Sequence, residues 1–483
     1  MGELHDLTAV EQAAAVRRGE LSAIELVEHY LARVDALGRT VGAFVTVTAD
    51  AARAQAKAVD VARAADPDGL PPLAGVPTAI KDLTMTAGVR TTFGSAAFSD
   101  FVPDVDADVV GLLRAAGTIS LGKTTTSELG CSLYSEGAVA PPARNPWGLA
   151  FTAGGSSGGA AAAVAAGLVP VAQGSDGGGS LRIPAAICGL VGYKPSRGLV
   201  SGGPLGFGGF GLPTNGPIAR TVADAATLLD AMAVSVPGEP YPSPSAPADG
   251  FRAAVRRAEP GRLRIGRFTA PMLAEVPVDS ACLGAVDTTA AALVEAGHDV
   301  VDVPAPFGPE LTPMFETIWY ALALSPVPPE REAELLPLTR WLRERGVAIG
   351  AAGLMNALAA MQAAVREALR ALRQFDLLLS PTLAMPQAAV GWFTETGHPA
   401  DDFERQKWFS PYCAYYNVTG QPAVSLPVGS TTDGMPVGAM LAGRLGEDET
   451  VLATAAQLEQ GMAWHERHPA IWRTAPSATV NGV

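Results

Sequence analysis

The sequence predicts an α/β fold in which a central mixed, largely parallel β-sheet is covered on both faces by α-helices. Two observations lead to this expectation. Short apolar segments typical of strands alternate with amphipathic segments typical of helices, and such alternation is characteristic of sheets packed between helices. The chain has 483 residues, 48% of them hydrophobic and 17% charged, which is enough apolar material for a large core.

The N-terminal part shows the alternation clearly. Ser22 and Glu25 have capping-box spacing, and we expect an amphipathic helix that starts there and stops near Gly38. Asp106 is expected to cap a later helix that ends at Gly117. The other elements predicted in this part are a helix over residues 50–65 and strands over residues 76–81 and 118–121.

The alternation resumes after residues 234–250, a stretch rich in Pro, Ser and Gly that indicates a connector. We expect a single domain over residues 1–483, with a mostly helical insert over residues 240–375. The elements predicted after the connector are strands over residues 264–268, 299–303, 375–380, 424–428 and 437–441, helices over residues 279–296 and 448–460, and mostly helical segments over residues 311–372.

Charge and apolar runs exclude several classes of partner. The net charge of −14 argues against a nucleic-acid partner, because its phosphates would be repelled. The longest apolar runs are too short and too interrupted to span a bilayer, and the N-terminus lacks the basic and apolar regions of a signal peptide. We therefore expect a cytoplasmic protein that binds neither nucleic acid nor a membrane. Nothing in the sequence sets its oligomeric state.

The sequence shows no metal-binding spacing, so we expect neither a metal nor another cofactor. The histidines are scattered, and only His465 and His468 are close together, in what we expect to be a solvated terminus. The cysteines lack CxxC spacing and are expected to be reduced and buried; they are Cys131, Cys188, Cys282 and Cys413.

Two serines lie in glycine-rich segments 24 residues apart, Ser156 within Gly-Gly-Ser-Ser-Gly-Gly and Ser180 after three consecutive glycines. Glycines let backbone amides approach a ligand closely. A serine hydroxyl beside such amides suits acyl transfer, because the hydroxyl attacks the carbonyl and the amides hold the oxyanion. Upstream, Lys81 follows an apolar strand, and burial there would lower its pKa enough for it to act as a base. The sequence thus predicts a serine hydrolase with a lysine base.

Three other interpretations compete with this one. Gly154-x-Ser156-x-Gly158 fits the nucleophile elbow of Ser-His-Asp hydrolases, although no clear strand precedes it. Ser120-x-x-Lys123 fits the serine–lysine motif of penicillin-binding enzymes, but it follows a strand instead of opening a helix, and the companion motifs are missing. Lys81 taken alone also fits a side chain that emerges into solvent at the end of a strand.

Several motifs together resemble the amidase signature family. The main ones are Gly-Val-Pro-Thr-Ala-Ile-Lys-Asp at residues 75–82, Gly-Gly-Ser-Ser-Gly-Gly at residues 154–159 and Gly-Ser-Leu-Arg-Ile-Pro-Ala at residues 179–185. Further matches lie at residues 121–124, 144–147, 189–195, 216–220, 380–382 and 417–423. The resemblance spans nearly the whole chain and implies the amidase-signature fold and an amidase activity. Within the family, the chain looks nearest to amidases that act on nylon oligomers.

The resemblance also implies a role for each matching residue. Ser180 would be the nucleophile, Lys81 the base, and Ser156, joined to Gly155 by a cis peptide bond, the bridge between them. Asp176 and Arg182 would brace the loop that carries Ser180. The amides expected to form the oxyanion hole are those of Gly177, Gly178, Gly179 and Ser180.

One departure from the family pattern is visible in that loop. Ser175 and Gly177 stand where many members carry bulkier β-branched residues, which we expect to loosen the loop. The helical insert, with Trp319, and the segment 201–216, a plausible mobile loop, are expected to help build the substrate pocket. The other residues expected at the pocket wall are Gly130, Cys131, Ser132, Met314 and Phe315.

The function expected from the resemblance is hydrolysis of a mostly apolar aryl or alkyl amide through an acyl-enzyme. A carbamate or ester hydrolase with the same site is the nearest alternative. A second alternative is the amidase subunit of a tRNA-dependent amidotransferase, and a third is a catalytically silent binding protein, against which the intact Lys81, Ser156 and Ser180 argue.

Overall fold

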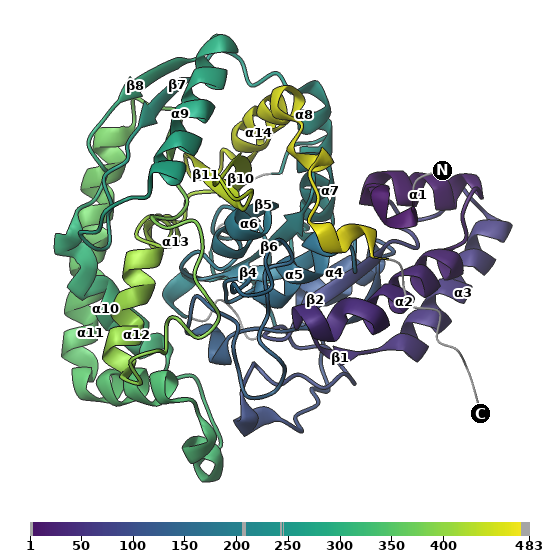
Figure 1. The fold of residues 1–483 in the computed structure, drawn as a ribbon, viewed down its shortest axis with the longest axis horizontal. Helices are drawn as coiled ribbons and strands as arrows, with labels where there is room; N and C mark the ends of the chain where they lie inside the picture. The colour runs from purple at the N-terminus through teal and green to yellow at the C-terminus, as the bar shows by residue number, and fades with distance from the viewer. Residues whose placement is uncertain (1–2, 205–208, 242–243, 245, 475–483) are drawn as a thin grey trace.

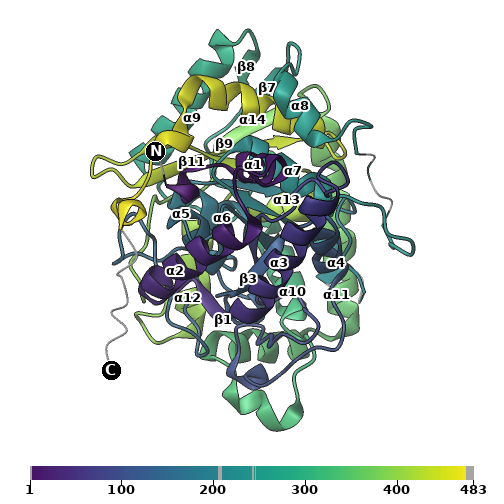
Figure 2. The same cartoon turned by 90° about the vertical axis from the view of Figure 1, so that its right-hand side faces the viewer.

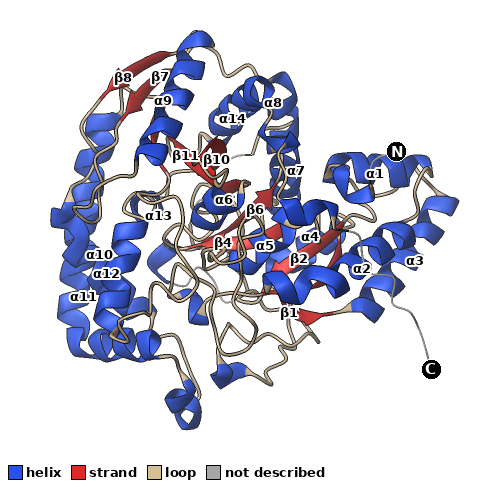
Figure 3. Ribbon diagram, viewed as in Figure 1, coloured by secondary structure: helices blue, strands red, loops and turns tan. Residues whose placement is uncertain are grey.

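The computed structural model describes residues 3–204, 209–241, 244 and 246–474. Within this part of the chain, eleven strands form one sheet in the order β1-β3-β2-β4-β6-β5-β10-β11-β9-β7-β8. Helices lie on both sides of this sheet (Figures 1 and 3). The predicted fold class, α/β with a mixed sheet between helices, is confirmed.

The strands are β1 (Phe44–Val47), β2 (Pro77–Lys81), β3 (Ile119–Thr124), β4 (Val171–Asp176), β5 (Val191–Lys194), β6 (Thr214–Ala219), β7 (Arg264–Arg267), β8 (Asp299–Asp302), β9 (Leu377–Pro381), β10 (Ala423–Ser430) and β11 (Pro436–Gly443). Six of the ten neighbouring pairs described are antiparallel, so the prediction of a largely parallel sheet is wrong. Short connections between strands are one cause of the antiparallel pairing. The five residues between β10 and β11 are enough for a turn but too few for the crossover that parallel pairing needs.

The helices are α1 (Ala9–Arg18), α2 (Ala23–Val41), α3 (Ala49–Ala65), α4 (Asp108–Ala115), α5 (Gly158–Ala165), α6 (Arg182–Cys188), α7 (Val222–Met232), α8 (Phe251–Arg257), α9 (Ser280–Glu295), α10 (Thr312–Leu322), α11 (Pro337–Leu372), α12 (Pro399–Phe409), α13 (Ala414–Thr419) and α14 (Asp448–Met462). Figures 1 and 2 show α2 and α3 beside the end of the sheet that holds β1 and β3, and both helices contact β3.

Successive residues of the central strands enter two different cores. In β2, Ala79 packs with α2 and α5, whereas Ile80 packs with α4, α7 and α14. In β4, Ala172 and Val171 divide in the same way. Because side chains alternate across a strand, a sheet with helices on both faces needs apolar residues at successive positions, which explains the continuous apolar runs in these strands.

Two predicted helix boundaries differ from the structure. The capping box of Ser22 and Glu25 is present, but α2 continues past Gly38 and ends at Val41, with Gly42 as its C-cap. A single glycine weakens an amphipathic helix without ending it. Asp106 does not cap α4, because its carboxylate accepts a hydrogen bond from the Ala87 amide at 2.9 Å and pairs with Arg114 at 2.8 Å.

The insert predicted over residues 240–375 is not purely helical, because β7 and β8 belong to the main sheet. Its longest element, α11, has a non-helical residue at Gly350 and packs against α10 and α12. By length and composition alone, α11 could cross a membrane, and it is the one helix among those described that could do so.

The sheet brings the predicted site residues together at one edge. Strands β2 and β4 are parallel neighbours, so Lys81 and Asp176, the last residues of the two strands, lie at the same edge. Ser156 precedes α5, which contacts β2 and β4, and Ser180 precedes α6, which contacts α5 and the strands β5, β10 and β11. Figure 1 shows both helices at the centre of the molecule. Of the segment 201–216 predicted as a loop, residues 214–216 are the start of β6, and residues 205–208 lie outside the described residues.

Candidate active site

Lys81 is completely buried at the end of β2. Its Nζ lies 2.7 Å from Ser156 Oγ, 3.0 Å from Ser175 Oγ and 3.1 Å from the Ser175 carbonyl oxygen. Burial lowers the pKa of Lys81 to about 7, although the charge of Asp176 acts in the opposite direction. A large fraction of Lys81 is therefore neutral near neutral pH, and the alternative of a solvent-exposed side chain is wrong.

The three contacts of Nζ match those that a neutral amine can make. A neutral lysine has two N–H donors and one lone pair. The Ser175 carbonyl can only accept a hydrogen bond, and the Ser175 hydroxyl can accept a second. In the neutral state both N–H groups can point to Ser175, which leaves the lone pair for the Ser156 hydroxyl. Ser175, which the sequence singled out only as a departure from the family pattern, thus contacts and orients the Lys81 amine.

Ser156 is held between two backbone segments. The Gly155–Ser156 peptide bond is cis, as the resemblance predicts. Gly130 adjoins the hydroxyl, since a Cβ added at Gly130 would lie 3.8 Å from Ser156 Oγ. The next hydroxyl along the chain, that of Ser157, donates to the Ser175 carbonyl at 3.1 Å. The Ser156 hydroxyl thus lies between Gly130 and Lys81, whose Nζ is 2.7 Å away.

Ser180 lies at the entrance to α6, with its carbonyl accepting a hydrogen bond from the Ser157 amide at 3.3 Å. Among the described residues, the Ser180 hydroxyl has no hydrogen-bond partner. The expected hydrogen bond from Ser180 to Ser156 is therefore not formed, whereas the one between Ser156 and Lys81 is. Hydrogen bonds of catalytic groups are often long in the free enzyme and tighten with substrate, because a serine hydroxyl turns about a single bond.

The loop before Ser180 presents free backbone amides. Gly179 has a φ of +128°, which favours glycine, and its amide donates to Asp176 Oδ1 at 2.7 Å. That amide is therefore occupied. In the part of the chain that the structure describes, the amides of Gly177, Gly178 and Ser180 have no partner. These three are the ones free to hold an oxyanion.

A buried ion pair fixes this loop, as the resemblance predicts. The Arg182 guanidinium contacts both carboxylate oxygens of Asp176 at 2.9 Å, and both side chains are completely buried. Burial by itself would raise the pKa of Asp176, but the charge and hydrogen bonds of Arg182 outweigh it and hold that pKa well below its usual range. Asn417 completes the cluster, with its Nδ2 2.9 Å from Asp176 and its Oδ1 2.7 Å from Arg182.

Trp319 lies over the same loop. A Cβ added at Gly178 would lie 3.3 Å from the indole ring, which stacks on Phe315 with ring centroids 5.6 Å apart. The indole N–H donates to the Cys131 carbonyl at 3.4 Å, so two of the residues expected at the pocket wall contact each other. Ser132 directs its hydroxyl to the Tyr134 carbonyl at 2.9 Å instead. Gly178, Phe315 and Trp319 line a small cavity of about 30 Å³.

The competing motifs lack the geometry that they require. Ser120 and Lys123 both lie within β3, and Lys123 Nζ donates to the Thr84 carbonyl at 2.5 Å and to Thr91 Oγ at 2.7 Å. No strand leads into Ser156, and no histidine among the described residues contacts it. The serine–lysine motif in β3 and the nucleophile elbow are therefore both excluded.

The cysteines and histidines lie outside this arrangement. All four cysteines are free and buried, as predicted. His468 is half-buried and stacked on Trp472, so its expected place in solvent is wrong. The sequence also missed a pair: His5 Nδ1 lies 3.0 Å from His29 Nε2, with Glu3 nearby. These two residues are too far apart in the sequence for spacing to reveal them.

Comparison with known proteins identifies the family. The profile of a family described as Amidase matches residues 25–452. The chain belongs to the amidase signature family. It is 35% identical to an acylamidase of Rhodococcus erythropolis, over 97% of this chain and 98% of that protein. It is 36% identical to a glutamyl-tRNA(Gln) amidotransferase subunit of Thioalkalivibrio sulfidiphilus, over 96% of this chain and 99% of that protein.

The fold agrees with this identification. A solved structure of 6-aminohexanoate cyclic dimer hydrolase, complexed with substrate, matches with a TM-score of 0.88 and 30% identity over 97% of this chain and 100% of that chain. The chain is thus an amidase, a hydrolase that acts on amides.

The buried ion pair generates a prediction about stability. Arg182→Ala leaves the Asp176 carboxylate buried without its cation, which is expected to cost about 3–5 kcal/mol of the free energy of unfolding. The urea midpoint measures this change. Arg262→Ala is the control, because Arg262 is exposed and unpartnered among the described residues, and it should change stability by less than about 0.5 kcal/mol. Equal effects of the two substitutions would contradict the role of the pair.

Proposed function

We propose that this amidase hydrolyses mostly apolar amides through an acyl-enzyme, with Ser180 as the nucleophile, Ser156 as the proton relay and Lys81 as the base. The observation that supports this most strongly is the 2.7 Å contact between Lys81 Nζ and Ser156 Oγ in a fully buried position. A lysine that is partly neutral at working pH and faces a hydroxyl is suited to remove a proton.

Acylation begins when the Ser156 hydroxyl passes its proton to Lys81 and takes the proton of Ser180. The Ser180 oxygen then attacks the amide carbon and forms a tetrahedral oxyanion. The free amides of Gly177, Gly178 and Ser180 are suited to stabilise that oxyanion. A donor of this kind is worth about 3–4 kcal/mol in known hydrolases, because it is fixed before the charge develops.

Collapse of the tetrahedral intermediate breaks the C–N bond. The proton held by Lys81 returns through Ser156 to the leaving nitrogen, so that the amine departs neutral. Water then attacks the acyl-enzyme by the same relay, releases the carboxylic acid and restores the Ser180 hydroxyl. Each step moves one proton along the same line, so no metal or cofactor is required.

Apolar walls support the proposed substrate class. Trp319 and Phe315 lie beside the loop that carries Ser180, together with Leu133 and Leu273. Flat aromatic walls favour aryl and alkyl groups. A carbamate or an ester undergoes the same acylation, so a panel of matched anilide, carbamate and ester substrates sets the order of preference.

A second candidate function is supported by one of the relatives, the amidotransferase component whose length the chain covers almost completely. In that role the chain would work within a complex. Hydrolysis of an anilide by the purified chain alone would exclude this role as its only function.

Ser180→Ala is expected to lower kcat on an anilide at least about 1000-fold, because it deletes the nucleophile and little volume. Initial rates measure turnover, and circular dichroism shows whether the fold is kept. Ser280→Ala, at an exposed serine at the start of α9, is the matched control and should keep the wild-type rate. A Ser180→Ala variant with appreciable kcat would sink the assignment of the nucleophile.

The pH dependence follows from the lowered pKa of Lys81. The base is active when neutral, so kcat/KM is expected to rise with pH through about 7 and then level off. Below that value, each pH unit should lower kcat/KM about tenfold. Lys81→Met should remove the activity, whereas Lys57→Met, at an exposed lysine of α3, should leave the profile intact. An acidic optimum together with an active Lys81→Met variant would contradict a lysine base.

A further inference from the structure

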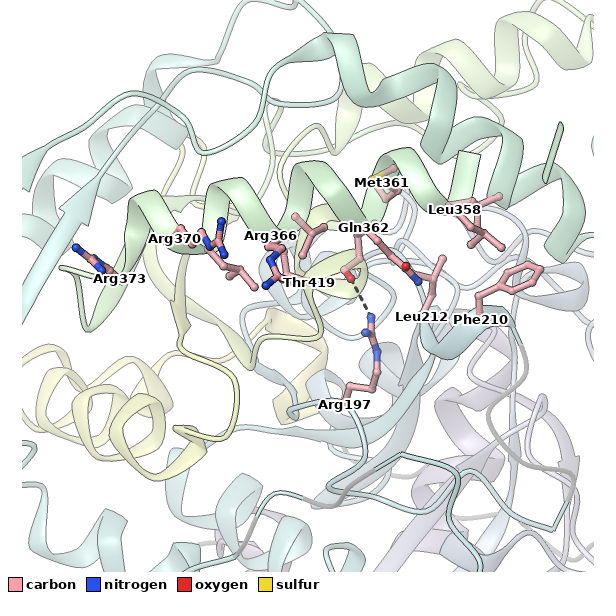
Figure 4. Close-up of a pocket in the computed structure, with 14 residues that line it drawn as sticks. Arg197, Phe210, Leu212, Leu358, Met361, Gln362, Arg366, Arg370, Arg373 and Thr419 are labelled. Atoms are coloured by element: carbon pink, nitrogen blue, oxygen red, sulfur yellow. Dashed lines mark hydrogen bonds between the residues drawn. The ribbon is translucent and has the colours of Figure 1, made fainter. Parts of the chain in front are cut away.

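A cavity of about 530 Å³ lies beneath the second half of α11 (Figure 4). Its opposite wall includes Leu212 and Arg197, and this wall is joined to the active site. The Leu212 carbonyl accepts a hydrogen bond from Asn417, the residue that holds Asp176. A Cβ added at Gly177 would lie 3.6 Å from Pro213, the residue after Leu212. The cavity wall at Leu212 is thus connected through Pro213 and Asn417 to the loop that carries Ser180, while residues 177–180 are not among those that line the cavity.

The two ends of the cavity differ in chemistry. Phe210, Leu212 and Leu358 make one end apolar, and Arg366 and Arg370 make the other end basic (Figure 4). Residues four apart on a helix lie on one face, which places both guanidinium groups at the same wall. Since a helix rises 1.5 Å per residue, about 12 Å of α11 separates Leu358 from Arg366.

Three of the arginines that line this cavity come from the end of α11 and from the residue that follows it. Among the described residues, the side chains of Arg366, Arg370 and Arg373 make no hydrogen bond and no ion pair. Arg197 differs from them, because it donates to the carbonyl of Val418 at 3.0 Å and so holds the wall in place. Arg366, Arg370 and Arg373 are all exposed, so among the described residues their guanidinium groups are open to a ligand at this cavity.

We propose that this cavity takes the far end of the substrate, and that this end carries an anionic group, with a carboxylate as the simplest case. The inference rests on the proposed function, because the scissile amide has to lie beside the Gly177–Ser180 loop. The apolar end of the cavity then covers the chain next to the amide, and the Arg366 and Arg370 guanidinium groups bind the anion. Guanidinium groups suit this task, because their fixed N–H groups match the two oxygens of a carboxylate.

The test compares two p-nitroanilides of equal chain length, that of decanoic acid and the mono-anilide of sebacic acid, which adds a terminal carboxylate. Wild-type kcat/KM is expected to be about tenfold higher for the anionic substrate, because one charge-assisted hydrogen bond changes affinity by about this factor. The difference should appear mainly in KM. Long-range attraction cannot produce this preference, because the protein is acidic. A second pair of substrates carries the alkyl chain, with and without the terminal carboxylate, on the amine side of the scissile amide. Both pairs are needed because the proposal assigns the cavity to the far end of the substrate without specifying the acyl or the amine part.

The double variant R366Q/R370Q should bring the ratio of the two kcat/KM values close to one. Arg262→Gln removes a positive charge elsewhere on the surface and should keep the wild-type ratio. Binding of the same ligands to Ser180→Ala, measured by calorimetry, separates the cavity from the chemistry. If Ser180→Ala binds the anionic ligand more tightly than the neutral one, and R366Q/R370Q removes this difference, the cavity binds the anion. This conclusion holds even if Ser180 is not the nucleophile. Absence of any preference with both substrate series, or a ratio unchanged in R366Q/R370Q, would overturn the proposal.

Discussion

An ammonium group is costly to remove from water, and Lys81 is completely buried at the end of β2. The rest of the site is arranged around this constraint. Burial brings the pKa of Lys81 to about 7, and the carbonyl and hydroxyl of Ser175 take up its N–H groups. The lone pair is then left for Ser156. The proposed chemistry therefore depends on keeping Lys81 out of solvent at the end of β2.

The buried carboxylate of Asp176 is the second group on which the arrangement of the site depends. Asp176 keeps its charge because Arg182 and Asn417 surround it, and its carboxylate takes the Gly179 amide. This fixes the loop in a shape in which the amides of Gly177, Gly178 and Ser180 have no partner among the described residues. The same carboxylate opposes the fall in the pKa of Lys81. The value near 7 is thus a balance between burial and the charge of Asp176, both of which are set by the ends of neighbouring strands.

Much of this arrangement could be predicted from the sequence, because local patterns carry it. The apolar run before Lys81 and the glycines before Ser180 predicted a buried base and an amide-rich loop. The role of Ser175 could not be predicted, because it depends on the parallel pairing of β2 with β4, and no local pattern encodes which strands become neighbours. The antiparallel share of the sheet was missed for the same reason. The cavity between Leu212 and α11 could not be predicted either, because it is formed by segments that are distant in the sequence.

The most direct test of this account is the titration of Lys81 itself. In protein labelled with ¹³C at lysine Cε, the chemical shift of each lysine follows its protonation, and the signal missing from Lys81→Met identifies Lys81. The account predicts a midpoint near 7 for this signal in the free enzyme. Ser175→Ala should move that midpoint, because it removes a contact of Nζ. A midpoint close to the ordinary lysine value of about 10.4 would contradict the claim that Lys81 is the neutral base.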